Sequence, residues 1–405
     1  MERAVGAQPS AQHDAPSKHY KHGCSEMIPT RRHALGLLAA SAVSGVSAAS
    51  AQDWLVQARA ALAPGGPIDS EMNALALAGR FSGVVLAAVD GDPVLVKAWG
   101  EADRAAGATN TTSTQFNIAS AGKMFTAVGM GRLTEAGEVR LDDRLSRYLP
   151  DFPRDIASRI SIEQLLAHTS GLGSYFASPL WQTQRGAIRS VSDFVELVRG
   201  ETLQFEPGSQ YSYSNSGYVL LGAVIEQVTG VDYYEAMQRL VFEPAGMTRT
   251  GYPNFLAEPE GVAIGYENGC FGRSPQQCAS SPWRDARPLW GARGSPAGGG
   301  VSTVHDLHAF IEALKRGQLL HPDTFAQMRA ARNRMNRPGG PIDAYGLGFG
   351  RLTIHGRPSW GHNGGTPGAQ AQIDVIEDVR LTLIVLSNQD GGQRAASAVL
   401  RRAVV

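Results

Sequence analysis

The strand-forming segments of this chain lie near its two ends, with a long helical stretch between them. Two apolar runs, Phe81–Val89 and Val94–Trp99, flank the turn residues Asp90–Pro93 and predict an antiparallel hairpin. Near the other end, Gln370–Ile376 and Arg380–Ser387 predict two further strands around a short turn. We therefore expect one antiparallel sheet assembled from both chain ends, with a mainly helical insertion packed against it.

The segments between and beside these strands carry helical patterns and helix stop signals. The predicted helices are Asp53–Arg80, Ser120–Ala136, Ile162–His168, Ser192–Arg199, Gly217–Val228, Asp232–Phe242, Thr303–Arg316 and Gln393–Val404. Residues 251–300 and 336–350 are rich in Pro and Gly and predict long surface loops. The expected fold class is α/β (α+β) in one domain, 52–400, with sheet parts near 65–118 and 300–405 and a helical part near 119–299.

The bulk composition excludes some classes of function. Of the 405 residues, 43% are hydrophobic and 18% are charged, which is ordinary for a soluble globular protein. Lys plus Arg and Asp plus Glu both number 37, so the formal net charge is zero. We therefore expect no nucleic-acid partner, because such proteins carry a basic surface. The sequence does not fix an oligomeric state, and a monomer is our expectation.

The N-terminal residues 1–51 predict an export signal that is not part of the fold. Arg31 and Arg32 precede a weakly apolar, Ala-rich run that closes with the small residues 49–51, as at a signal-peptide cleavage site. The twin arginine favours the Tat route and a periplasmic or secreted protein, with no membrane span left after cleavage. A start at Met27 would give a signal of normal length. The alternative is a poorly ordered helix or a membrane anchor.

Two cysteines remain beyond the signal. Cys270 and Cys278 lie in a Gly/Ser/Pro-rich segment, and in an exported protein such a pair predicts a loop disulfide. The alternative is two free thiols. A metal site is not favoured, because the segment contains no histidine.

A lysine in an apolar helix start is the first chemical signal. The chain has five lysines, and Lys123 lies three residues after Ser120 in the stretch FNIASAGKMFTAVGM. Residues three apart share a helix face, and burial would lower the lysine pKa. A lysine with a lowered pKa can take the proton of a serine hydroxyl. Alone, this pair is a weak signal that arises readily by chance.

Two further clusters have the same ambiguity when each is taken alone. Tyr213 and Asn215 precede a predicted helix; a tyrosine can relay protons if a nearby cation lowers its pKa, and an asparagine can orient a lysine. The alternative is a turn that caps the helix. His362 is followed by Gly364 and Gly365, where a substrate could approach the backbone and meet an oxyanion hole formed with the Ser120 N–H. The alternative is a Gly-rich hairpin with an exposed histidine.

Together, these clusters carry a resemblance to a known family. Ser120-x-x-Lys123, Tyr213-x-Asn215 and His362-x-Gly364, in this order, resemble the serine β-lactamase and penicillin-binding-protein superfamily, with the class C branch the closest in pattern. The stretches LLAHTSGL, YSNSGYVLLG, PAGGGVSTVHDL and YGLGFG are also similar to family segments, and the similarity covers roughly residues 70–390. The fold that the resemblance implies, of the β-lactamase/transpeptidase type, agrees with the expected sheet and helical insertion.

The resemblance implies an acyl-enzyme route without a metal or organic cofactor. Ser120 would attack a carbonyl carbon, Lys123 and Tyr213 would move the proton, and Asn215 would orient them. The oxyanion would lie between the N–H groups of Ser120 and Gly365. The substrate would be a small molecule or a peptidoglycan-like compound.

One departure from the class C pattern shapes the expected activity. His362 stands where class C β-lactamases normally have a lysine, and a neutral histidine is a weaker carboxylate anchor. Asn363 replaces the usual hydroxyl residue. We therefore expect an esterase or a D-amino-acid or DD-peptidase, with a class C β-lactamase as the first alternative. A non-catalytic cell-wall-binding protein is the alternative of another class. His168, at a helix end, is interpreted as structural.

Overall fold

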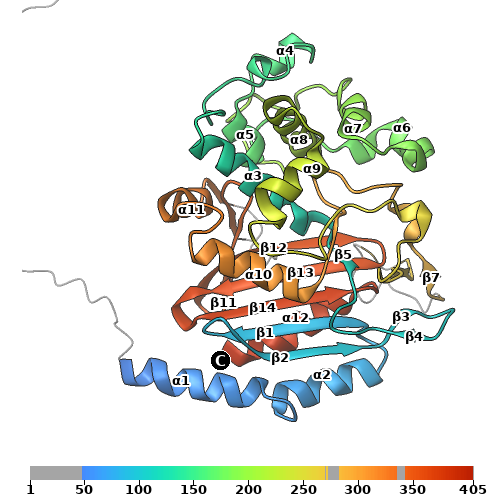
Figure 1. Ribbon diagram of the computed structural model, residues 1–405, viewed down its shortest axis with the longest axis vertical. Coiled ribbons are helices and arrows are strands. Elements are labelled where there is room, and N and C mark those ends of the chain that lie inside the picture. Colours follow the sequence, from blue (N-terminus) through green and yellow to red (C-terminus); the bar gives the residue numbers. More distant parts are fainter. Residues whose placement is uncertain (1–47, 270, 272–281, 335–342, 405) are drawn as a thin grey trace, which may run out of the picture. The chain divides into compact units, whose positions relative to one another are not determined.

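An antiparallel sheet organises the chain (Figure 1). The computed structural model describes residues 48–269, 271, 282–334 and 343–404. Among them, eight strands form the main sheet in the order β2-β1-β14-β13-β12-β11-β10-β9. Their bounds are β1 Gly83–Val89, β2 Asp92–Trp99, β9 Asn333–Arg334, β10 Ala344–Tyr345, β11 Gly350–Ile354, β12 Arg357–Thr366, β13 Ala369–Ile376 and β14 Leu381–Ser387.

The two ends of the chain meet at the centre of this sheet. Strand β1 pairs with β14 along its whole length, from Gly83 opposite Ser387 to Val89 opposite Leu381. The expectation of one sheet built from both ends is confirmed. The first hairpin has a tighter turn than predicted, because only Asp90 and Gly91 form it, with φ of 60° and 81°. Two left-handed residues fit the right-handed twist of the strands.

Alternate residues of the central strands face two separate apolar layers. Val85 and Leu383 point toward a layer with helices α1 (Ala48–Leu62), α2 (Pro67–Leu77) and α12 (Gly392–Leu400). Val84 and Leu386 point toward the other layer, with α3 (Lys123–Glu135) and α10 (Val304–Lys315). The predicted helix Asp53–Arg80 is two helices, because Pro64 and Gly65 interrupt it and Gly65 has φ of 80°.

The helical part lies on the α3 side of the sheet (Figure 1). Its further helices are α4 Arg154–Ala157, α5 Ile162–Leu166, α6 Pro179–Gln184, α7 Val191–Val198, α8 Asn215–Thr229, α9 Tyr233–Met237 and α11 Pro322–Arg329. The short strands β5 (Phe116–Asn117) and β8 (Val301–Ser302) pair with each other. Strand β5 leads into the helical part, and strand β8 leads out of most of it. Because the two strands pair, the chain enters and leaves at one place, at the edge of the site described below.

Two segments differ from the expectation, and other predictions fall on residues that the structure does not describe. Residues 343–350 do not form a surface loop, because β10 begins there and Tyr345 is completely buried. His362–Gly365 belong to a strand of their own, β12, rather than to the entry of the next strand. Of the predicted signal region 1–51, residues 1–47 lie outside the described residues and residues 48–51 begin helix α1. Cys270 and Cys278 also lie outside the described residues. No helix in the described part of the chain is long and apolar enough to cross a bilayer.

Candidate active site

Ser120 lies at a sharp reversal between strand β5 and helix α3. Ala119 has φ of 45°, a left-handed conformation that is uncommon for a residue with a β-carbon. The Asn117 side chain stabilises the reversal by accepting the Ala119 N–H at 2.9 Å. The predicted helix begins here as a 3-10 turn, Ala119–Gly122, before α3. Ser120 is therefore in a first helical turn, where backbone N–H groups have no partner within the helix.

Lys123 has no exposed surface, and its amine contacts three oxygens. Nζ lies 2.6 Å from the Ala297 carbonyl oxygen, 2.8 Å from Asn215 Oδ1 and 3.5 Å from Ser120 Oγ. Burial lowers the pKa of Lys123 well below its usual 10.5. In the neutral amine, two N–H groups can donate to Ala297 and Asn215 while the lone pair faces the Ser120 hydroxyl. The Ala297 carbonyl was not identifiable from the sequence as part of this site.

Tyr213 and Asn215 approach the same amine from the loop before α8. The ring of Tyr213 has its centroid 4.8 Å from Lys123 Nζ. Burial raises the pKa of Tyr213, although a hydrogen bond with the Ser120 side chain opposes this. The nearby lysine therefore does not lower the tyrosine pKa as the sequence interpretation required, and the phenol stays protonated. Asn215 donates from Nδ2 to Ser174 Oγ at 3.0 Å, which fixes Oδ1 toward Lys123.

His168 holds this loop in place from behind. Its imidazole Nδ1 accepts the Ser214 N–H at 3.1 Å, and its carbonyl accepts the Ser212 N–H at 2.9 Å. Its ring packs against that of Tyr213 with centroids 4.2 Å apart. His168 thus bonds to backbone, as a structural histidine would, but to a segment distant in sequence rather than to its own helix end. It is fully buried and has φ of 58°.

His362 does not face the space beside Ser120. The imidazole is 1% exposed, with Nε2 2.8 Å from the Tyr345 hydroxyl and Nδ1 2.6 Å from the Asn363 carbonyl oxygen. A carbonyl only accepts, so Nδ1 carries the proton and Nε2 accepts from Tyr345. Burial and the charge of Lys123 lower the pKa of His362 to about 3. The ring is therefore neutral at pH 7 and is not available to a substrate carboxylate.

The glycines after His362 let strand β12 lie against the serine turn. A β-carbon on Gly364 would stand 2.0 Å from the Ile118 carbonyl oxygen and 3.0 Å from the Ser120 backbone nitrogen. No other residue fits at this distance. Gly365 follows on the rim of a cavity that Ser120 and Asn215 also line. The structure thus places Ser120, Asn215 and Gly365 in the cavity wall. Lys123, Tyr213 and Gly364 do not line the cavity but contact Ser120 or its backbone from behind.

This cavity is narrow and mostly apolar. Its volume is about 60 Å³, and its walls are contributed mainly by the helical part. Tyr175, Phe176, Trp181 and Trp290, which we call the aromatic wall, lie on one side. The rings of Tyr175, Phe176 and Trp181 pack on one another, with the centroids of Tyr175 and Trp181 5.1 Å apart, whereas Trp290 packs on Phe255. No pattern in the sequence indicates this wall or Arg293, which also lines the cavity.

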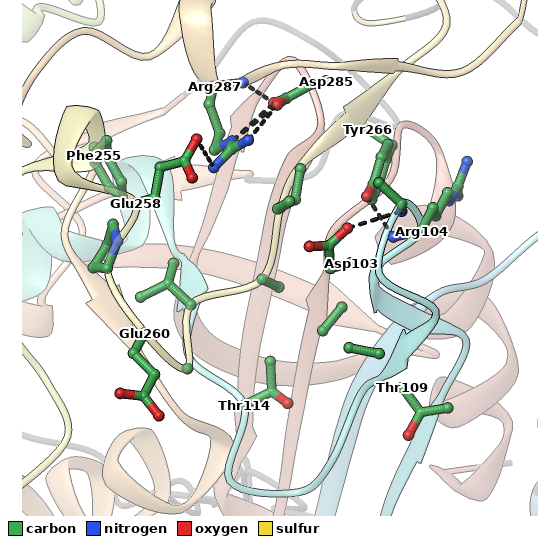
Figure 2. A pocket seen from close by; sticks show the side chains of 18 of the residues that line it. Asp103, Arg104, Thr109, Thr114, Phe255, Glu258, Glu260, Tyr266, Asp285 and Arg287 are labelled. Atoms are coloured by element: carbon green, nitrogen blue, oxygen red, sulfur yellow. Dashed lines mark hydrogen bonds and ion pairs between the residues drawn. The ribbon is translucent and has the colours of Figure 1, made fainter.

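A larger groove of about 830 Å³ lies beyond Trp290, which lines both spaces. Figure 2 shows its charged side chains, most of which are already paired. Arg287 binds Asp285 at 2.7 Å and Glu258 at 3.1 Å, while the Arg104 guanidinium lies 4.2 Å from the centroid of the Tyr266 ring. None of its lining residues is a serine, cysteine, lysine or histidine. Among the described residues, the groove has no nucleophile set comparable to that beside Ser120.

Comparisons with known proteins agree with this geometry. The family model described as "Beta-lactamase" matches residues 56–405. Penicillin-binding protein 4* of Bacillus subtilis is 31% identical over 338 residues, which cover 80% of this chain and 72% of the relative. Esterase EstB of Burkholderia gladioli is 30% identical, covering 67% and 74%. A D-aminopeptidase of Cereibacter sphaeroides is 27% identical, covering 84% of this chain but only 63% of the relative.

A solved structure gives the same result for the fold. The penicillin-binding protein from Bacillus halodurans superposes with a TM-score of 0.73 at 28% identity. The match covers 82% of this chain and 99% of that protein. The overall fold of this chain therefore follows an arrangement already known from experiment.

Proposed function

Because this chain belongs to the beta-lactamase family and is a serine hydrolase, we propose that it forms an acyl-enzyme on Ser120 and hydrolyses an ester or amide. The observation that carries the proposal is the environment of Lys123. Its amine is fully buried, has its two carbonyl-type acceptors in place and lies 3.5 Å from Ser120 Oγ. Among the described residues, no carboxylate lies within 4.0 Å to stabilise its charged form.

The proton moves in a defined order in this proposal. Ser120 Oγ attacks the carbonyl carbon while its proton passes to neutral Lys123 Nζ. The negative oxygen that forms is held by the N–H groups of Ser120 and Gly365. Tyr213, protonated because burial raises its pKa, relays a proton to the leaving group and regains one from Lys123. Water then attacks the acyl carbon and loses its proton to the same pair. The bond to Ser120 Oγ breaks, the pair returns that proton to Oγ, and the acid leaves.

Two other functions remain as alternatives. A class C β-lactamase normally has a lysine in the third motif to anchor the carboxylate of a β-lactam, and the buried, neutral His362 cannot act at that position. A non-catalytic wall-binding protein would not need a buried lysine beside the serine. Export by the Tat route to the periplasm or the medium is part of the proposal and rests on residues 31–51 alone. A monomer is likewise part of the proposal.

The test is a substrate panel with a matched pair of variants. The purified chain is assayed with p-nitrophenyl esters, D-Ala-D-Ala peptides and a chromogenic cephalosporin, as wild type, Ser120→Ala and Ser113→Ala. Ser113 is exposed, so its loss should change nothing. We expect turnover of an ester or peptide that falls by a factor on the order of a thousand in Ser120→Ala. We also expect a fluorophosphonate to add its mass at Ser120.

Other outcomes separate the alternatives. Turnover that is unchanged in Ser120→Ala would remove the mechanism. Fast cephalosporin turnover would favour the β-lactamase. Absence of both turnover and labelling in a folded protein would favour the wall-binding protein.

A further inference from the structure

Among the described residues, Arg293 is the only one with a full charge that lines the cavity beside Ser120. It lies in the loop that leads to Ala297, whose carbonyl binds Lys123. The other lining residues are apolar, aromatic or neutral polar. A single permanent cation in a narrow apolar cavity is an unusual choice unless an anion binds there, because a charge loses hydration in such a place.

The guanidinium is held at one edge and one face. Nε donates to the Tyr252 carbonyl oxygen at 2.8 Å, and the guanidinium carbon lies 3.5 Å from the centroid of the Tyr234 ring. Tyr234 is itself fixed, since its hydroxyl donates to the Gly294 carbonyl at 3.0 Å. This arrangement orients the planar guanidinium group and leaves its two terminal nitrogens to donate to another partner.

Within the described residues, no carboxylate lies within 4.0 Å of Arg293, in contrast to Arg287 nearby, which binds two. Two other cationic candidates are near the serine, and neither can serve a substrate. Lys123 has no exposed surface, and His362 is 1% exposed and bonded at both nitrogens. Arg293 is therefore the cation that a substrate anion in this cavity can reach.

We propose that Arg293 binds a carboxylate of the substrate, and that the substrates are esters or amides carrying both an apolar group and a carboxylate. This inference rests on the proposed function of Ser120. The apolar group packs against the aromatic wall, and Phe176 and Leu289, 48% and 40% exposed, extend the apolar surface outward. Substrates with a free ammonium group bind poorly, because the cavity is lined by an arginine and by no acidic residue.

The experiment compares esters that differ only in charge. One pair is the phenylacetyl esters of 3-hydroxybenzoate and of methyl 3-hydroxybenzoate, with the carboxylate on the leaving group. The other is the p-nitrophenyl esters of (3-carboxyphenyl)acetate and of its methyl ester, with the carboxylate on the acyl group. We expect wild type to prefer the carboxylate member of at least one pair by roughly ten- to a hundredfold in kcat/KM, as for charge-assisted bonds.

Three variants assign this preference to Arg293. Arg293→Gln should bring the carboxylate and neutral members of each pair to similar kcat/KM values, and Arg293→Lys should keep part of the preference. Arg394→Gln, an equal change of net charge at an exposed position of α12, should keep all of it. Thermal unfolding checks that each variant is folded. Should Arg293→Gln not fold, wild type must still be inhibited more strongly by phenylacetate than by phenylacetamide.

The inference and the proposed function fail in different ways. A wild type without preference for either carboxylate, or a preference that survives in folded Arg293→Gln, overturns the role of Arg293 and leaves Ser120 unaffected. Equal inhibition by phenylacetate and phenylacetamide overturns it as well. Turnover of both neutral esters that persists in Ser120→Ala overturns the proposed function instead.

Discussion

Lys123 is the single residue on which the proposed chemistry depends most. Burial lowers its pKa well below 10.5, and only the neutral amine can take the Ser120 proton. The neutral fraction grows as the pH rises through this lowered pKa, so kcat/KM of wild type should rise with pH and then level off. Lys123→Arg, which stays protonated at all accessible pH values, should lose roughly a hundredfold or more. Steady-state assays between pH 5 and about 10 measure both effects.

A control for this prediction is Lys315→Arg. Lys315 binds Glu312 and Thr382 at the end of α10 and does not line the cavity. Its pH profile should match that of wild type. If kcat/KM of Lys123→Arg still rose with pH as in wild type, the rise would have to come from the titration of another group.

His362 affects stability rather than substrate binding. Its pKa in the folded protein is about 3, against an ordinary value of 6.5, so between these values the unfolded chain binds a proton that the folded chain does not. The free energy of unfolding should therefore fall as the pH falls from 6.5 toward 3. His362→Gln removes this contribution, which amounts to about 2–3 kcal/mol between pH 7.5 and 4.5. Urea unfolding at pH 7.5 and 4.5 should show that the free energy of unfolding falls less in the variant than in wild type. An equal fall in both proteins would contradict the prediction.

The residues of the three motifs could be predicted from the sequence, because each motif keeps its reacting atoms within a few residues. Arg293 and the aromatic wall could not. Their shared cavity depends on contacts between segments far apart along the chain, such as Tyr175 with Ser295 at 3.1 Å. The orientation of His362 was also out of reach, because its partner Tyr345 lies in a segment that reads as a loop.

The loop before α8 acts as one element with the end of α5. His168 accepts the Ser214 N–H and packs on Tyr213, so it fixes where the phenol lies relative to Ser120. His168→Ala should lower kcat roughly tenfold or more with little change in KM, since the loop shifts while the cavity walls stay. It should also lose stability, because its backbone has φ of 58°.

A matched variant separates position from backbone strain. His168→Asn tolerates the left-handed conformation, and its Oδ1 can accept a backbone N–H. His168→Asn should therefore be closer to wild type in stability than in kcat, because asparagine lacks the ring that packs on Tyr213. Equal kcat in wild type and both variants would show that the histidine does not position the loop.

Elements with strong periodicity were predicted well, whereas short or Gly-rich ones were not. Strands β13 and β14 lie within one residue of their predicted bounds, since β13 alternates apolar and polar residues and β14 reads as a nearly continuous apolar run. Strand β12 contains Pro358 and three glycines, which indicate a loop when taken locally. It is a strand because β11 and β13 pair with it on both sides, and the glycines allow the serine turn to approach.

At the scale of the whole molecule, the sheet separates two apolar layers. One contains α1, α2 and α12, and the other contains α3, α10 and the residues around the site. Leu383 and Leu386 lie on the same strand, β14, and are both buried, but they face opposite layers. Either leucine replaced by alanine should cost about 2–5 kcal/mol of unfolding free energy. Only Leu386 packs in the layer that includes Ile118 and Met124, which flank the serine turn.

The two variants should therefore differ in activity although they lose similar stability. Leu383→Ala should keep the wild-type kcat per folded molecule, because the cavity it leaves adjoins α1, α2 and α12. Leu386→Ala should lower kcat severalfold, because the serine turn must be held within a fraction of an ångström to keep its geometry. Chemical unfolding gives the stability change, and active-site titration with a fluorophosphonate corrects for the folded fraction. A lower kcat in Leu383→Ala alone would mean that the sheet transmits strain instead of isolating the site.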